Sequence, residues 1–219
     1  MCSTRDPIDL FTSLWDYSKL GDVYGMSLER YALADKRGRL ADRKRVKLRH
    51  VGRNQMLFDF GLEPRHFDDE EAVRRKILEI DETFDMVLMA DKFEESVALL
   101  REALCWTHED VSYLKLNSRQ GGKKTPPLSA AARRALRHWL RADFMLFDHF
   151  RNKFDGLVAG KGARGMQRET EILSATNKIV RDKCVIEEME YAKLPKIYRV
   201  VQQNLHCKSK HFNICPPLV

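Results

Sequence analysis

The run DMVLMA, residues 85–90, limits the choice of fold more than any other part of this sequence. It is short, continuous and apolar, which is typical of a strand buried on both faces of a parallel sheet. Amphipathic helical patterns flank it on both sides, over residues 69–84 and 91–104. A second apolar run, VSYLKL at residues 111–116, predicts another strand. Helices and strands that alternate in this way indicate an α/β fold with a parallel sheet flanked by helices.

Helical patterns cover most of the remaining sequence, so we also expect a helical C-terminal part. Asp6 can cap a helix that begins at Pro7, because the missing proline N–H would have no partner at that position. The other expected helices cover residues 27–35, 129–154 and 166–190, and glycine-containing loops cover residues 117–127 and 156–165. The chain is long enough for one good core. We expect one domain over residues 1–190, followed by a tail over residues 191–219.

Basic residues modestly outnumber acidic residues. Lys and Arg together number 39, against 32 for Asp and Glu, which gives a formal net charge of +7. Such an excess suits phosphate-bearing ligands, nucleic acids or anionic membrane surfaces without choosing among them. Residues 36–49 hold eight basic side chains, and they form either a nuclear-localisation or nucleic-acid-binding segment or a solvated one. No aromatic residue is interleaved there, which argues against base stacking.

Five cysteines, an odd number, leave the redox state open. Their wide spacing weakly favours reduced thiols and still permits two disulfides with one thiol left over. Near the C-terminus, His206, Cys207, His211 and Cys215 could bind zinc, although their spacing matches no standard zinc finger. A disulfide between Cys207 and Cys215, or two free thiols, fits this tail better. The sequence contains no Walker-type phosphate loop, no H-E-x-x-H and no G-x-S-x-G.

Three places could carry polar chemistry. Arg5 stands directly before the capped helix, where the helix N-terminus favours anions and a guanidinium can bind a phosphate through two hydrogen bonds. It could equally be an ordinary surface arginine. His108, in WTHEDV, is either a general base or a histidine in a surface turn. In the loop NSRQGGKK, Arg119, Lys123 and Lys124 either clamp an anion or are simply solvated.

Five segments occur in an order and at approximate spacings that resemble one protein family. They are RDPIDLFTSLWDY, RNQMLFDFGL, FDMVLMADKFEESVALLREALCW, EDVSYLKLNSR and RADFMLFDHFRNKF. Together they resemble the galactose 3-O-sulfotransferases, a family that includes galactosylceramide sulfotransferase. The likeness runs from about residue 3 to about residue 185 and is most specific between Phe84 and Trp106. It implies a partial form of the P-loop-like sulfotransferase fold.

The resemblance implies a sulfate donor, PAPS (3′-phosphoadenosine-5′-phosphosulfate), and no metal. Sulfotransferases of this broad fold bind the 3′-phosphate of the donor with an arginine, commonly followed by an x-Pro pair, and with a serine eight positions after that arginine. Arg5, Pro7 and Ser13 have this spacing. By resemblance, Arg5 pairs with the 3′-phosphate and Ser13 donates a hydrogen bond to it. Arg119 then lies in a basic loop that covers the donor.

The resemblance also implies parts that this sequence does not contain. Family members carry a membrane anchor and, further upstream than Arg5, a lysine- and threonine-rich loop that holds the 5′-phosphosulfate, together with the catalytic base. We therefore expect this chain to be the C-terminal part of a sulfotransferase on the lumenal side of the Golgi membrane. The implied reaction transfers a sulfuryl group to the 3-hydroxyl of galactose. Asn54 and Asp59 are candidates for acceptor binding, or else they cap or pack a buried loop.

Two other functions remain open from the sequence. A remnant without catalytic activity could pair with a full-length relative, because the donor loop is missing. A basic nucleic-acid-binding protein could use residues 36–49, and its affinity would then fall steeply with salt. The order of the five segments favours the sulfotransferase, with a galactose-terminated glycolipid or glycan as its partner. It leaves the question of homo-oligomers open.

Overall fold

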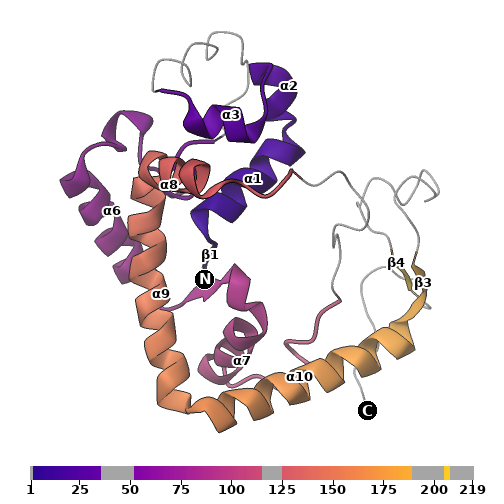
Figure 1. Cartoon of the computed structure of the whole chain (residues 1–219). Coiled ribbons are helices and arrows are strands. Elements are labelled where there is room, and N and C mark those ends of the chain that lie inside the picture. The colour runs from indigo at the N-terminus through magenta and orange to yellow at the C-terminus, as the bar shows by residue number, and fades with distance from the viewer. Residues whose placement is uncertain (1, 36–51, 115–124, 189–204, 208–219) are drawn as a thin grey trace. The chain divides into compact units, whose positions relative to one another are not determined.

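The computed structural model describes residues 2–35, 52–114, 125–188 and 205–207 (Figure 1). The chain forms two compact units, which we describe separately. The N-terminal unit comprises Met1–Lys92 and Lys123–Gly156, and the C-terminal unit comprises Phe93–Gly122 and Leu157–Val219. Most described residues are helical, and no helix among them is both long and apolar enough to cross a membrane. The division expected at residue 190 lies outside the described residues.

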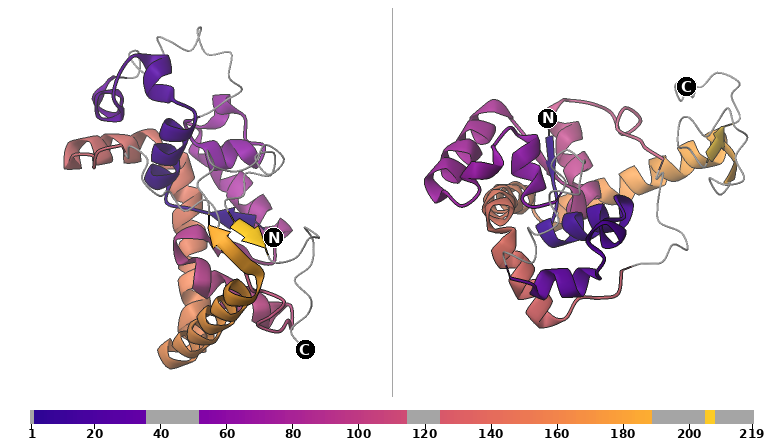
Figure 2. Two further views of the ribbon diagram at one scale, coloured as in Figure 1. Left: turned by 90° about the vertical axis from the view of Figure 1, so that its right-hand side faces the viewer. Right: turned by 90° about the horizontal axis from the view of Figure 1, so that it is seen from above.

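A small parallel sheet lies in the N-terminal unit (Figures 1 and 2). β1 (Cys2–Thr4) pairs with β2 (Val87–Met89) in parallel, with Thr4 opposite Met89. Every residue of β2 is buried, which confirms the strand expected within residues 85–90 and its parallel pairing. The sequence does not predict β1, because a three-residue strand is too short to show an alternation of side chains.

Three helices follow β1 and begin largely where local signals indicate. They are α1 (Pro7–Tyr17), α2 (Leu20–Tyr24) and α3 (Leu28–Leu33). The Asp6 side chain caps α1 as predicted, accepting hydrogen bonds from the backbone N–H groups of Ile8 and Asp9 at 2.9 and 3.0 Å. The side chain of Ser27 caps α3. Short polar side chains in these positions satisfy N–H groups that have no partner within the helix.

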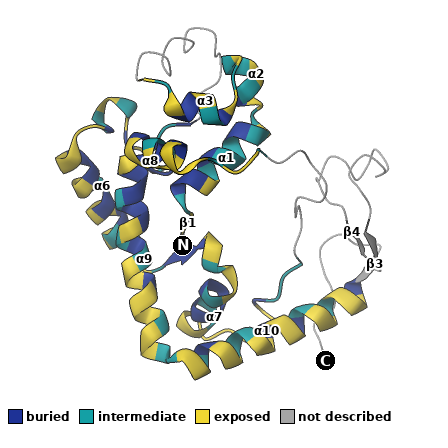
Figure 3. Ribbon diagram, viewed as in Figure 1, coloured by how far each residue is buried: buried dark blue, intermediate teal, exposed yellow. Residues whose placement is uncertain are grey.

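Aromatic side chains of these helices form the centre of a core. The ring centroid of Trp15 lies 4.9 Å from that of Tyr31 and 5.7 Å from that of Tyr24. Phe11 stacks on Tyr31 at 5.8 Å. Helix α8 (Ala130–Trp139) packs against α1 and α3, and its buried face is distinct from its exposed face (Figure 3). This core therefore joins segments that are more than a hundred residues apart in sequence.

The helix expected over residues 129–154 is in fact two helices. α8 begins after Ser129, whose side chain caps it, and α9 (Arg141–Lys161) follows after a break at Leu140. Leu140 has φ −100° and ψ 22°, so it leaves helical geometry, yet its side chain is buried. The break lets both helices turn apolar side chains toward the core, which explains why the apolar pattern continues across it.

Three further elements precede β2 in the N-terminal unit. They are α5 (Gln55–Asp59), a 3-10 turn (Pro64–His66) and α6 (Glu70–Thr83). Asp69 caps α6, the helix expected over residues 69–84, and accepts hydrogen bonds from two backbone N–H groups. α6 and α9 are connected where His149 hydrogen-bonds to Asp81 at 3.0 Å (Figure 1).

The loop expected over residues 156–165 is largely helical. α9 continues to Lys161, and α10 (Ala163–Cys184) begins directly after Gly162, which has a φ of 76°. Each glycine inside a helix costs about 1 kcal/mol relative to alanine, so a glycine-rich stretch is normally a loop signal. Only Gly162 breaks the helix here, because it alone adopts the left-handed conformation within this stretch.

The C-terminal unit is built around two helices. α7 (Phe93–Ala103), preceded by a 3-10 turn (Ala90–Lys92), packs against α10. Val97, Val111 and Leu173 are buried together in its core. β3 (Val185–Glu188) pairs antiparallel with β4 (Leu205–Cys207).

The second expected strand is absent from residues 111–114, the part of it that the structure describes. The backbone N–H of Tyr113 donates instead to the side-chain Oδ1 of Asn177 in α10, at 2.8 Å. A helix side chain therefore takes the place of a neighbouring strand. That part of the strand prediction is wrong, because an apolar run does not reveal which group its backbone will meet.

Candidate functional site

Arg5 lies between β1 and α1, and its side chain is exposed. Among the described residues, its guanidinium makes no hydrogen bond and no ion pair. The backbone on both sides is held, because β1 pairs with β2 and Asp6 caps α1. An exposed cation on an ordered backbone can bind an anion without first giving up a protein partner.

The N–H groups at the start of α1 are not open to a ligand. Asp6 already accepts hydrogen bonds from Ile8 and Asp9, and Asp9 adds a second carboxylate to the first turn. An anion at this helix N-terminus would face both negative charges. The helix N-terminus expected to favour an anion beside Arg5 therefore has no free N–H group at Ile8 or Asp9. Any anion there has to be held by side chains.

Ser13 lies on the side of α1 that faces away from the core. Phe11 and Trp15, two residues before and after it, are both buried, whereas Ser13 is only partly buried. Arg5 precedes it by eight residues, a rise of about 12 Å in an α-helix, so the Arg5 side chain must lean along α1 to share a ligand with Ser13. Asp9, four residues before Ser13, lies on the same side and would repel a phosphate.

The chain after the basic loop returns to α1 close to Ser13. The hydroxyl of Thr125 donates a hydrogen bond to the carboxylate of Asp16, three residues after Ser13. Arg119 and the two lysines of that loop lie outside the described residues. The second of these lysines directly precedes Thr125 in the sequence. One end of the loop is therefore anchored near Ser13, and the role predicted for Arg119 stays a prediction.

Elsewhere in the N-terminal unit, two helix N-termini cap each other. The carboxylate of Asp143, in the first turn of α9, accepts hydrogen bonds from the backbone N–H groups of Met56 and Leu57 at 3.1 and 3.0 Å. In return, the Oδ1 atom of Asn54 accepts a hydrogen bond from the backbone N–H of Asp143 at 3.2 Å. First-turn N–H groups have no acceptor within their own helix. The two side chains thus supply acceptors across 89 residues of sequence.

This arrangement favours the capping interpretation of Asn54 over acceptor binding. Asn54 is fully buried, and its Nδ2 atom has no hydrogen-bond partner among the described residues. Asp59 is exposed and accepts a hydrogen bond from the Gln55 side chain at 2.8 Å. The sequence does not indicate Asp143, because the helix that it caps belongs to a distant segment.

The environment of Asp143 changes its ionisation. Burial raises the pKa of Asp143 from its ordinary value of 3.8 to about 7, although the hydrogen bonds from Leu57 and Met56 act in the opposite direction. The negative charge of Asp59 adds to the rise. Near neutral pH this carboxyl group therefore exists in both its charged and its neutral form.

We expect Asp143 to make the N-terminal unit less stable as the pH rises from about 4 to about 7. The folded state holds this proton more tightly than the unfolded state, so the stabilisation is complete below about pH 4 and is lost as the pH rises through about 7. One such group changes the free energy of unfolding by at most about 1.4 kcal/mol per pH unit. Urea unfolding between these pH values should show a flatter profile for Asp143→Asn than for the wild type. Parallel profiles would contradict this assignment.

His108 belongs to an ion-pair cluster of the C-terminal unit. The Glu169 carboxylate accepts a hydrogen bond from Arg101 at 2.8 Å and lies 3.1 Å from Nε2 of His108. Burial raises the pKa of Glu169, but the hydrogen bond and charge of Arg101, with smaller effects of Lys161 and His108, leave the pKa below its ordinary value. His108 lies in a turn, as one of the two interpretations expects, and joins that turn to α10.

The cysteines that the structure describes are not all reduced, which differs in part from the state that their spacing weakly favours. Cys105 is free and exposed, whereas Cys184 forms a disulfide, so the expectation of reduced thiols is wrong at Cys184. The zinc or disulfide site that includes His211 and Cys215, and the basic segment 36–49, lie outside the described residues. Within the described ranges, no group of three or more His, Cys, Asp or Glu side chains could hold a metal ion.

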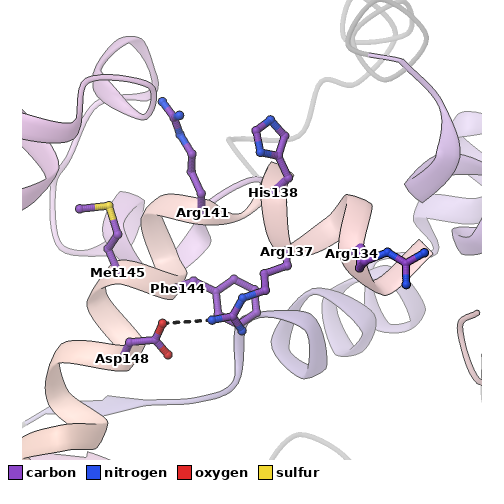
Figure 4. A pocket seen from close by; sticks show the side chains of 7 residues that line it. All are labelled: Arg134, Arg137, His138, Arg141, Phe144, Met145 and Asp148. Carbon is purple, nitrogen blue, oxygen red and sulfur yellow. Dashed lines mark hydrogen bonds and ion pairs between the residues drawn. The ribbon is translucent and has the colours of Figure 1, made fainter. Parts of the chain in front are cut away.

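The structure also shows a pocket that the sequence analysis missed (Figure 4). Its volume is about 430 Å³. It is lined by Arg134, Arg137, His138, Arg141, Phe144, Met145 and Asp148, from α8 and α9. A signal for it exists in the sequence, because the four basic residues recur at helical spacing, three, four and seven positions after the first. Neither Arg5 nor Ser13 lines this pocket.

Comparisons with known proteins identify relatives of this chain. A family model described as galactose-3-O-sulfotransferase matches residues 2–204. The chain is 37% identical over 136 residues to galactosylceramide sulfotransferase of Mus musculus, a match that covers 62% of this chain and 32% of the relative. It is 32% identical over 187 residues to galactose-3-O-sulfotransferase 3 of Homo sapiens, which covers 81% of this chain and 42% of the relative.

A third relative, galactose-3-O-sulfotransferase 2 of Homo sapiens, is 36% identical over 140 residues, covering 63% of this chain and 35% of the relative. The chain thus spans between 32% and 42% of the length of these curated relatives. No solved structure matches it.

Proposed function

This chain belongs to the galactose-3-O-sulfotransferase family, and from that premise we propose that it holds the 3′-phosphate end of a PAPS donor. The observation that supports this most directly is Arg5, an exposed arginine on an ordered backbone with no protein partner among the described residues. It has the spacing to Ser13 that sulfotransferases use for the 3′-phosphate. The proposed reaction is transfer of a sulfuryl group from PAPS to the 3-hydroxyl of galactose in a glycolipid or glycan.

In this proposal, side chains and not the helix N-terminus hold the phosphate. Arg5 binds two of its oxygens through a planar pair of N–H groups, and Ser13 donates one hydroxyl hydrogen bond. Arg119 adds positive charge from the loop whose far end is anchored by Thr125 on Asp16. These residues bind and orient the donor, and they take no proton from the sugar.

The chemistry of the transfer assigns a separate task to groups outside this site. The sulfuryl group moves from the donor phosphate oxygen to the sugar oxygen, the hydroxyl proton passes to a general base, and cations stabilise the charge left on the nucleotide. Arg5 acts at the 3′-phosphate and therefore fixes the position of the leaving nucleotide. The base stays unassigned.

The disulfide at Cys184 supports a lumenal location for the protein. Disulfides persist in oxidising compartments and are rare in the cytosol. Cys184 is disulfide-bonded, so we place the chain in the secretory pathway, with the Golgi membrane as the proposed site of action. The relatives named galactosylceramide sulfotransferase act, by that name, on a glycolipid. On the basis of that likeness, we propose a galactose-terminated acceptor for this chain as well.

The test is binding of 3′,5′-ADP, which carries the 3′-phosphate of the donor and lacks the sulfate. We expect Arg5→Ala to raise its Kd about 30-fold, since a charge-assisted hydrogen-bonding pair contributes about 2 kcal/mol. Asp9→Asn should lower the Kd, because it removes a negative charge beside Ser13. Isothermal titration calorimetry of the full 219-residue chain measures both effects.

Arg30→Ala is the matched control for this experiment. Arg30 is also exposed and lies in the same unit, on α3, so its removal changes the net charge equally. The Kd of Arg30→Ala for 3′,5′-ADP should stay within twofold of the wild-type Kd. An equal loss of affinity in Arg5→Ala and Arg30→Ala, or no loss in either, would remove Arg5 from the site.

A further inference from the structure

We propose that the pocket on α8 and α9 is a second anion site, which binds a phosphate or sulfate monoester group. The pocket is defined by the seven lining residues named above and drawn in Figure 4. Three arginines, one histidine and one carboxylate line it, and of these described cations only Arg137 is paired with the carboxylate, Asp148 (Figure 4). Because this site shares no residue with the Arg5 site, it stands or falls independently of the proposed function.

The core packing of α8 determines where the cations lie. Leu136 and Trp139, on one side of α8, are buried against the helices of the N-terminal core. Arg134, Arg137 and His138 are exposed on the other side. The helix cannot rotate to hide these charges without exposing its apolar side chains. The positive charge is therefore a fixed property of this surface.

One arginine of the pocket is already oriented. The guanidinium carbon of Arg137 lies 4.1 Å from the ring centroid of Phe144, and its Nη2 atom lies 3.2 Å from Asp148 (Figure 4). Stacking on an aromatic ring restricts the guanidinium while leaving the edge N–H groups available to an acceptor. This lowers the entropy that Arg137 loses when it binds an anion.

The charges of the pocket are only partly compensated by neighbouring carboxylates. Asp148 pairs with Arg137, and Asp68 pairs with Arg141 at 3.5 Å. Arg134 and His138 make no hydrogen bond or ion pair to any residue that the structure describes. The charge of Arg134 is therefore available to a ligand, and Arg137 can exchange its exposed carboxylate for one. Arg141 is held more firmly, because it also donates a hydrogen bond to the backbone carbonyl of Asp68 at 2.7 Å. Exposed ion pairs of this kind are worth less than about 1 kcal/mol and break readily.

The pocket has room for a compact anion with a carbon substituent. Its volume of about 430 Å³ exceeds what a bare phosphate or sulfate needs. Phe144 and Met145 contribute apolar surface to the lining, where the carbon part of an ester can rest. Arginine forks match the geometry of phosphate and sulfate oxygens. The chemistry thus favours a monoester over a bare inorganic ion.

The experiment is a titration of the full chain with glycerol 3-phosphate, followed by NMR of the arginine side-chain N–H groups. We expect the double variant Arg134→Gln, Arg137→Gln to raise the Kd about tenfold or more, as the loss of charge-assisted hydrogen bonds implies. Asp148→Asn should lower the Kd about threefold, because it releases Arg137 from its carboxylate. A merely structural role for these residues would not tighten binding in this way.

The matched control is the double variant Arg74→Gln, Arg75→Gln. These two arginines are exposed on α6 in the same unit and pair with Glu70 and Glu71, so the charge change is identical. Its Kd for glycerol 3-phosphate should equal that of the wild type. Equal weakening in the two double variants would show only nonspecific charge attraction and would overturn the proposal.

Two arms identify the source of the anion. The first uses glycerol 3-phosphate in solution, and the second uses phosphatidylcholine vesicles with and without 20 mol% phosphatidic acid, which presents the same ester on a membrane (about 20% anionic lipid gives a negative surface). Binding to the vesicles at far lower ester concentration than in solution assigns the site to a lipid headgroup. Binding to both at similar concentration assigns it to a soluble ester. No binding in either arm overturns the proposal.

The donor nucleotide separates this site from the proposed function. The Arg134→Gln, Arg137→Gln variant should keep its affinity for 3′,5′-ADP, and Arg5→Ala should keep its affinity for glycerol 3-phosphate. Failure of the first proposal alone would appear as nucleotide binding unaffected by Arg5→Ala. If the pocket variant instead lost nucleotide binding, the pocket would be the donor site and the second-site proposal would be wrong.

Discussion

Replacing Asp143 with alanine is expected to lower the free energy of unfolding of the N-terminal unit by about 3 kcal/mol, since it leaves two buried backbone N–H groups without an acceptor. Those groups belong to Met56 and Leu57, and both donate only to the Asp143 carboxylate at the start of α5. Asn54 cannot replace it, because its own oxygen caps α9 and its Nδ2 atom is a donor. The start of α5 would therefore lose its cap completely.

Urea unfolding followed by tryptophan fluorescence measures this loss, because Trp15 and Trp139 both lie in the core of this unit. Asp148→Ala is the control: Asp148 is on the same helix but exposed, so it should cost less than about 1 kcal/mol. Asp143→Asn should fall between the two, since an amide oxygen still accepts one hydrogen bond. A cost for Asp143→Ala as small as that for Asp148→Ala would refute the reciprocal caps.

Replacing Phe11 with alanine is expected to cost the same unit about 3 to 5 kcal/mol, the usual range for removing a buried phenylalanine. Phe11 is 2% exposed, stacks on Tyr31 at 5.8 Å and lies 6.1 Å from the Trp15 ring. A Cβ atom added to Gly52 would lie 3.4 Å from the Phe11 ring, so Gly52 also borders the site of the cavity. Few neighbours can collapse into it without leaving their own contacts.

This change should also weaken nucleotide binding, although Phe11 points away from the proposed ligand. Ser13 is two residues later on α1, and the core contacts of Phe11 hold that helix in place. Tyr17→Ala is the matched control, because Tyr17 ends the same helix with 79% of its side chain exposed. We expect Tyr17→Ala to change the free energy of unfolding by less than about 0.5 kcal/mol and to leave nucleotide binding unchanged. Equal losses of stability in Phe11→Ala and Tyr17→Ala would show that the packing of Phe11 does not stabilise the core.

Much of the secondary structure follows from local chemistry. Asp6, Ser27, Asp69 and Ser129 each cap a helix that the sequence predicts to begin at or directly after them. Capping joins groups two or three residues apart, so a single segment contains both partners. The buried strand at β2 is predictable for a similar reason, since its apolar run is continuous.

Predictions fail where the partner of a backbone group comes from elsewhere in the chain. β1 forms because Val87–Met89 lies beside it, and residues 111–114 are not a strand because Asn177 takes the N–H of Tyr113. The break at Leu140 depends on a core assembled from α1, α3 and α8. Local propensity contains no information about such neighbours.

The candidate site likewise has features that the sequence predicts and features that depend on tertiary contacts. The spacing of Arg5, Pro7 and Ser13 is a property of the sequence, and it identified the family together with the other segments. Whether the start of α1 could receive an anion depended on the Asp6 and Asp9 side chains in three dimensions. The loop end at Thr125 met Asp16 only through the tertiary fold.

By itself, the sequence of this protein determined its family, the capped starts of α1, α3, α6 and α8, and the strand β2, because each of these rests on residues that are neighbours along the chain. Tertiary structure alone decided that Asp143 and Asn54 cap each other's helices and that four basic residues of α8 and α9 share one pocket with Phe144. The physical reason is that burial and hydrogen-bond pairing are properties of what surrounds a group in space. In this chain those surroundings come from segments as far as 89 residues away.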